Sequence, residues 1–119
     1  MKIITWKQAF LNYLLLVVLV IGVSILVSYI AQVIDTDPPG KYVQDEFNKQ
    51  VDCARKAGFK FRQPLLRVRN EIYISGRPYL GLAYLLLNII VIVPYASYET
   101  RAHELGHIID WQTKRKGHP

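Results

Sequence analysis

The sequence is poor in cysteine, because Cys53 is the only one among 119 residues. A single cysteine excludes an internal disulfide framework and a zinc site built from several thiolates. The thiol is therefore predicted to act as a small buried hydrophobic side chain. The sequence also has no internal repeat and no low-complexity segment.

Charged residues are missing from positions 8–34, which read QAFLNYLLLVVLVIGVSILVSYIAQVI. The run exceeds the roughly 20 residues that cross a bilayer core of about 30 Å. Trp6, Tyr13 and Tyr29 lie toward its ends, as aromatic residues at membrane interfaces do. A cleaved signal peptide is the alternative, but the run is longer than the roughly 7–15 apolar residues of such a peptide, and no clear cleavage site follows. Residues 1–34 are thus predicted to form a short cytoplasmic tip and a single transmembrane anchor.

Charge is unevenly distributed around this run, and the formal net charge of the chain is +6. Lys2 and Lys7 precede the run, whereas Asp35 and Asp37 follow it. Basic residues favour the cytoplasmic side, so the C-terminal domain is predicted to lie on the extracytoplasmic side. The basic residues form no stripe with interleaved aromatics, so no nucleic-acid partner is expected.

The remaining chain divides into a linker at residues 35–41, DTDPPGK, and a domain at 42–119. KYVQDEFNKQVDCARKAGF predicts an amphipathic helix that ends near Gly58. Its apolar residues recur at helical spacing: Val43, Phe47, Val51 and Ala54. LLRVRNEIYIS is rich in β-branched residues and predicts one strand or a hairpin.

A second uncharged stretch covers residues 79–98 and is long enough for a second membrane span. Gly81 interrupts its start, and Asn88 and Pro94 enclose the β-branched run IIVIV. These features favour a buried strand. Two spans would also require the basic segment between them to be translocated, which is unfavourable.

The last helix is predicted to begin after Ser97 and to carry the sequence RAHELGHIID. His103 and His107 stand four residues apart, so both imidazoles project from one helix face and can reach one zinc ion. Glu104, next to the first histidine, could take a proton from water and pass it to a leaving amine. This pattern, H-E-x-x-H, is the signature of zinc hydrolases.

Residues 42–111 resemble the small zincin metallopeptidases, particularly the minimal gluzincin-like domains. The resemblance is carried by the IIVIV strand and by His103, Glu104, Gly106, His107 and, more weakly, Asp110. It implies an α+β domain made of a helix, a short β-sheet and the H-E-x-x-H helix. It also implies a bound Zn2+, with water as nucleophile and Glu104 as general base.

In the resembled family the last strand pairs with extended substrate by strand addition at a sheet edge. Here that strand, or its neighbour, is predicted to comprise Ile89, Ile90, Val91, Ile92 and Val93.

The third zinc ligand is less clearly indicated. The position two residues before the first histidine holds Arg101, where the family prefers an uncharged residue, and no downstream glutamate is present. His118 is the candidate ligand, because Gly117 can end the helix and reverse the chain. Asp110 and Glu99 are candidate carboxylates that would hydrogen-bond the histidines. A partner chain could also supply the ligand.

The sequence therefore predicts a membrane-anchored zinc metallopeptidase acting on a peptide or protein substrate. Three alternatives stay open. The domain could be a degenerate zincin that binds a protein partner without catalysis, or residues 79–98 could make the chain a two-span integral-membrane metalloprotease. The motif could also be accidental in a small two-span membrane protein.

Overall fold

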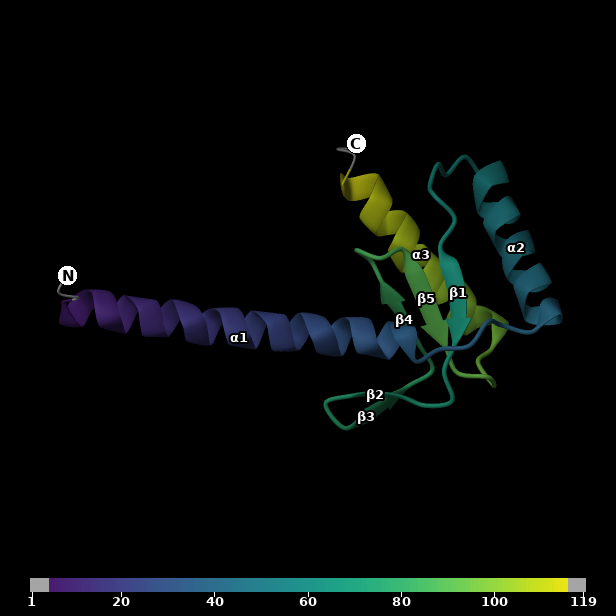
Figure 1. Cartoon of the computed structure of the whole chain (residues 1–119). Helices are drawn as coiled ribbons and strands as arrows, with labels where there is room; N and C mark the ends of the chain where they lie inside the picture. Colours follow the sequence, from purple (N-terminus) through teal and green to yellow (C-terminus); the bar gives the residue numbers. More distant parts are fainter. Residues whose placement is uncertain (1–4, 116–119) are drawn as a thin grey trace. The chain divides into compact units, whose positions relative to one another are not determined.

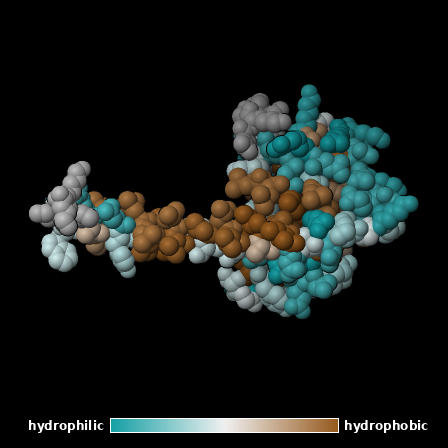
Figure 2. All heavy atoms as spheres, in the orientation of Figure 1, coloured by the Kyte–Doolittle hydropathy of each residue, from teal (hydrophilic) through white to brown (hydrophobic). Residues whose placement is uncertain are grey.

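The structure, a computed structural model, describes residues 5–115 and divides after Ile34 into two compact units (Figure 1). The first unit is built on helix α1, Trp6–Ile34, which has 29 residues. Figure 2 shows a nearly continuous hydrophobic surface along most of α1. Within residues 5–115, α1 is the one helix long and apolar enough to cross a membrane.

The second unit, residues 35–119, combines two helices with short strands. Its elements are α2 (Lys41–Lys56), β1 (Leu65–Val68), β2 (Ile72–Ile74), β3 (Arg77–Tyr79), β4 (Gly81–Tyr84), β5 (Ile89–Ile92) and α3 (Tyr98–Arg115). The predicted α+β class is confirmed.

Strand β5 lies at the centre of a three-stranded sheet in the order β1-β5-β4. It runs parallel to β1 and antiparallel to β4. Strands β2 and β3 form a separate antiparallel pair. Both predicted alternatives for LLRVRNEIYIS, one strand or a hairpin, are therefore wrong, because the segment forms two strands, β1 and β2, that belong to different sheets. The strand conformation ends between them, and β1 pairs with β5, which lies more than 20 residues later in the sequence.

The second uncharged stretch forms β4 and β5 rather than a helix. The chain turns between them at Asn88, which has a φ of 56°. Asparagine tolerates this left-handed conformation better than most residues. A second transmembrane helix at residues 79–98 is therefore wrong, and so is the two-span alternative. The predicted buried strand is confirmed at β5.

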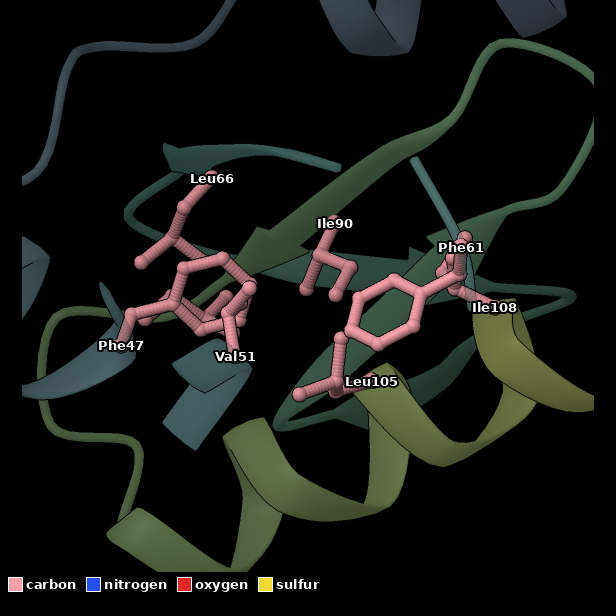
Figure 3. Packing of buried hydrophobic residues seen from close by; sticks show 8 residues of the cluster. Phe47, Val51, Phe61, Leu66, Ile90, Leu105 and Ile108 are labelled. Atoms are coloured by element: carbon pink, nitrogen blue, oxygen red, sulfur yellow. The ribbon is translucent and has the colours of Figure 1, made fainter. Parts of the chain in front are cut away.

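Both helices of the second unit pack on the same face of the sheet. Side chains from α2, β1, β5, α3 and the loop before β1 form one hydrophobic cluster (Figure 3): Phe47, Val51, Phe61, Leu66, Ile90, Ile92, Leu105 and Ile108. The predicted apolar face of α2 is confirmed, because Phe47 and Val51 are fully buried. Cys53 lies off this face and is exposed, so its predicted burial is wrong.

The predicted linker is held to the body of the second unit. The backbone groups of Asp37 and Val68 exchange two hydrogen bonds of 2.8 Å. The Arg67 guanidinium donates to the Thr36 hydroxyl and carbonyl oxygens. Helix α2 begins at Lys41, one residue before the predicted start of the domain.

Candidate metal centre

The N-terminal end of α3 is fixed by a cap and by a buried ion pair. The Thr100 backbone N–H donates to the Ser97 hydroxyl at 3.3 Å, as predicted for an N-cap. The guanidinium of Arg101, a buried residue, lies 3.2 Å from the Glu46 carboxylate on α2. Arg101 thus points away from the histidines and joins α3 to α2. This role accounts for a charged residue where the zincin pattern prefers an uncharged one.

The other end of α3 is fastened through Gln112, which is also buried. Its carboxamide accepts from the Arg62 backbone N–H at 2.8 Å and donates to the Arg62 carbonyl at 3.2 Å. It also donates to the Asn88 side-chain oxygen at 3.0 Å. These bonds tie α3 to the loop before β1 and to the β4–β5 turn.

Between these two attachments, α3 buries one stripe of residues against the sheet. The stripe follows helical spacing and comprises Arg101, Glu104, Leu105, Ile108 and Gln112. The opposite face, including His103, Gly106 and His107, is exposed. The fold therefore fixes the rotation of α3 and presents both histidines on its solvent side.

The two histidines converge at their Nε2 atoms, which lie 3.0 Å apart. Their ring centroids are 4.5 Å apart, and the ring planes are almost perpendicular, at 84°. Two nitrogen ligands that each lie about 2 Å from one tetrahedral zinc ion are separated by roughly 3.3 Å, slightly more than the observed separation. The pair His103 and His107 therefore fits two positions of a zinc coordination sphere.

Glu104 is only 8% exposed, although both neighbouring histidine positions on its helix are open to solvent. It can lie this close to the sheet because Gly81 of β4 has no side chain. A Cβ at Gly81 would stand 3.2 Å from the Glu104 Cγ and 3.1 Å from the Thr100 Cγ2. Burial raises the pKa of the Glu104 carboxyl, and the charges of His107 and His103 act in the opposite direction.

The histidines and Glu104 line one cavity of about 310 Å³ together with residues from β3, β4 and the following turn. The complete lining is Tyr79, Gly81, Leu82, Ala83, Leu85, His103, Glu104 and His107. Strand β4 lies at the edge of its sheet and pairs with β5 among the described strands. The cavity thus combines two imidazoles, one carboxylate and an apolar strand.

The other predicted site residues do not join this cavity. Asp110 is exposed and pairs with Lys114 at 3.1 Å, one turn further along α3. Glu99 is exposed at the start of the helix and does not line the cavity. His118 lies outside the described residues. Within residues 5–115, no group of three histidine, cysteine, aspartate or glutamate side chains is placed to hold a metal ion.

Residues 89–93 were predicted to be the edge strand that pairs with substrate or the neighbour of that strand, and β5 is the neighbour of the edge strand β4. β5, Ile89–Ile92, is bonded on both sides, so its edges are unavailable for strand addition. The neighbouring strand β4 is the one beside Glu104. The sequence contained a signal for β4 at Gly81, because a glycine in a strand often marks the close approach of another element.

Gly106, one of the residues that carry the resemblance, lies on the exposed face of α3. Apart from its two chain neighbours and the backbone of its own helix, no described heavy atom lies within 4 Å of the position that a Gly106 Cβ would take. The close approach occurs at Gly81 instead.

Compared with protein-family models, characterised proteins and solved structures, the chain matches none of them.

Proposed function

We propose that the chain is a membrane-anchored zinc metallopeptidase that hydrolyses peptide bonds in an extended substrate. The observation that carries this proposal is the convergence of the His103 and His107 Nε2 atoms at 3.0 Å in a cavity that Glu104 also lines. Helix α1 supports the membrane anchor by its length and apolar composition.

His103 and His107 would hold the zinc ion, and His118 or a partner chain would supply a further ligand. Zinc would supply Lewis-acid chemistry, which lowers the pKa of water and polarises a carbonyl group. The chain's own contribution is to present both imidazoles from one rigid helix that is fastened at both ends.

Glu104 would act as the general base and then as the general acid. Its carboxylate accepts a proton from the attacking water and delivers it to the nitrogen of the leaving amine. Burial makes the carboxylate a better proton acceptor, because desolvation raises its pKa. The glycine at position 81 leaves room for the Glu104 side chain, because a Cβ there would stand 3.2 Å from the Glu104 Cγ.

The position of β4 at the edge of its sheet suits an extended peptide, because main-chain groups at a sheet edge can pair with an added strand. Such a peptide would cross the cavity beside the histidines. The cavity is lined in part by the apolar side chains of Leu82, Ala83 and Leu85, which would favour small or apolar substrate side chains near the cleaved bond. The anchor would restrict the substrates to those at the membrane, on the extracytoplasmic side.

The test measures the zinc content and the hydrolysis of a mixture of quenched fluorescent peptides with the full-length chain in detergent. We expect one zinc ion per chain, lost in His103→Ala and in His107→Ala. Removal of zinc by a chelator should abolish hydrolysis, and added zinc should restore it. Asp110→Asn is the matched control and should keep both zinc and activity. His118→Ala tests the further ligand and should weaken zinc binding.

Two results would contradict the proposal. A folded chain that binds no zinc, even when zinc is supplied, would exclude the metallopeptidase. A chain that binds zinc but hydrolyses none of the peptides would instead favour the non-catalytic, partner-binding function.

A further inference from the structure

The candidate cavity holds two imidazole ligands, His103 and His107, one fewer than the three protein ligands that a catalytic zinc ion usually has. Asp110 and Glu99 do not line the cavity. Within residues 5–115, no set of three histidine, cysteine, aspartate or glutamate side chains is placed to hold a metal ion. A third ligand from this part of the chain therefore has to be a side chain of another kind.

Tyr79 is a side chain of another kind at the same cavity. Besides the histidines and Glu104, it is the one lining residue whose side chain carries an oxygen or nitrogen atom, because the others are glycine, alanine and leucine. Glu104 is only 8% exposed, and its Cγ lies beside Gly81 of the sheet. The Tyr79 hydroxyl makes no hydrogen bond to any residue of the described range 5–115. Its oxygen lone pairs are therefore available to a metal ion.

The pairing of the β2–β3 hairpin directs Tyr79 toward the body of the second unit. Tyr79 stands opposite Ile72 in the register, so both side chains lie on one face of the hairpin. Ile72 is only 5% exposed, which identifies this face as the one that packs on the unit. The carbonyl of the next residue, Leu80, accepts a hydrogen bond from the Val93 backbone N–H at 3.0 Å. Tyr79 is thus held from both sides at one wall of the cavity.

We propose that Tyr79 is an oxygen ligand of the zinc ion that His103 and His107 hold; this inference rests on the zinc site of the proposed function. Metal binding releases protons from its ligands, so the phenol proton passes to water and the phenolate oxygen binds zinc. Two imidazoles and one phenolate bring the protein ligands to three, and Glu104 stays free to act as the base. A ligand from His118 or from a partner chain would come in addition.

This ligand set joins two parts of the unit that are otherwise only loosely connected. The strands β2 and β3 pair only with one another, outside the three-stranded sheet. A two-stranded hairpin alone is marginally stable in water. Zinc bound to α3 and to Tyr79 would fasten the hairpin to the helix. Backbone amides of β2 and β3 should therefore exchange their hydrogens more slowly once zinc is added.

The experiment titrates zinc into the full-length chain in detergent, in competition with a chromophoric chelator, and records the near-ultraviolet difference spectrum. Tyr79→Phe removes the oxygen and keeps the ring. Tyr73→Phe is the matched control, because Tyr73 lies on the neighbouring strand, is 54% exposed and does not line the cavity. Tyr79→Phe should weaken zinc binding at least about tenfold, the loss that follows even from removing a group that orients a ligand.

The spectrum and the exchange rates separate a ligand from a merely structural residue. Zinc should produce the difference band of tyrosinate in the wild type and in Tyr73→Phe, and no such band in Tyr79→Phe. The slower exchange of the hairpin amides should also be lost in Tyr79→Phe. Thermal melts without zinc check that both variants fold.

The possible failures of the two proposals can be told apart. Zinc affinity and a tyrosinate band that are unchanged in Tyr79→Phe, with zinc still lost in His103→Ala, would overturn the inference and leave the zinc site standing. Slower hydrolysis by Tyr79→Phe at unchanged zinc affinity would make Tyr79 a substrate contact and would also overturn it. A folded wild type that binds no zinc would overturn both proposals.

Discussion

The two faces of α3 differ in what they contribute. The face toward the sheet carries the ion pair of Arg101, the apolar side chains of Leu105 and Ile108, and the hydrogen bonds of Gln112. The solvent face carries two exposed histidines, which do not take part in the core. Stability and chemistry are therefore separated by a rotation about one helix axis.

Glu104 is the residue where the two faces meet. It is buried with the residues that hold the fold, yet it lines the same cavity as the histidines. The difference between the faces teaches that substitutions on α3 should separate into two kinds. One kind should change the free energy of unfolding, and the other should change zinc binding or hydrolysis.

The largest effect is expected for Glu104→Gln, which keeps the shape of the side chain but removes the proton acceptor. Peptide hydrolysis should fall by roughly 10²–10⁴-fold, the usual contribution of a general acid–base group. Zinc content should stay unchanged. The measurement is the rate of hydrolysis at equal zinc loading. Glu99→Gln, an exposed acid on the same helix, is the control and should keep full activity; equal losses in both variants would refute the role of Glu104.

Ile108→Ala and His107→Ala compare neighbouring positions on opposite faces. Ile108 is fully buried, so its truncation should cost about 2–5 kcal/mol of unfolding free energy. His107→Ala, measured without zinc, should change it by less than about 0.5 kcal/mol, as most surface substitutions do. Chemical denaturation followed by circular dichroism measures both. Similar costs for the two variants would mean that the faces are not separated as described.

Gln112→Ala tests the polar attachment at the end of the buried face. The change leaves the Arg62 backbone N–H and the Asn88 side-chain oxygen without the bonds they make to Gln112, at a cost of about 1–3 kcal/mol. Gln63→Ala removes an exposed glutamine that donates to Asn48, and it should cost less than about 0.5 kcal/mol. Thermal melts of the two variants give the comparison. A Gln112→Ala melt no lower than that of Gln63→Ala would show that the buried bonds do not hold α3.

Much of the local structure could be predicted because local chemistry decides it. A continuous run of apolar residues predicts α1, the helical spacing of apolar residues predicts α2, and the Ser97 cap predicts the start of α3. The partners of short strands could not be predicted in this way. β1 pairs with β5 across more than 20 residues, and no local pattern in either strand specifies that register.

The candidate site was predictable in the same local sense. His103, Glu104 and His107 lie on one helix, so their spacing alone places both imidazoles on one face. The wall formed by β4 was not predictable, because it depends on which strand takes the sheet edge. The β-branched residues of β5 suit a fully buried central strand, so of the two predicted alternatives β5 is the neighbour of the edge strand.

The smallest effect is expected at Gly106, and its sign is opposite to the others. Gly106 lies on the exposed face, and open space surrounds the position of an added Cβ. Gly106→Ala should therefore raise the unfolding free energy by about 0.5–1 kcal/mol, because alanine loses less backbone entropy in a helix. Gly81→Ala is the matched control. Its added Cβ would crowd Thr100, Glu104 and Ile92, so this substitution should lower both the unfolding free energy and the activity. Denaturant titration measures both. A loss of stability in Gly106→Ala would show that something packs on the histidine face of α3, and that the face is not free in solution.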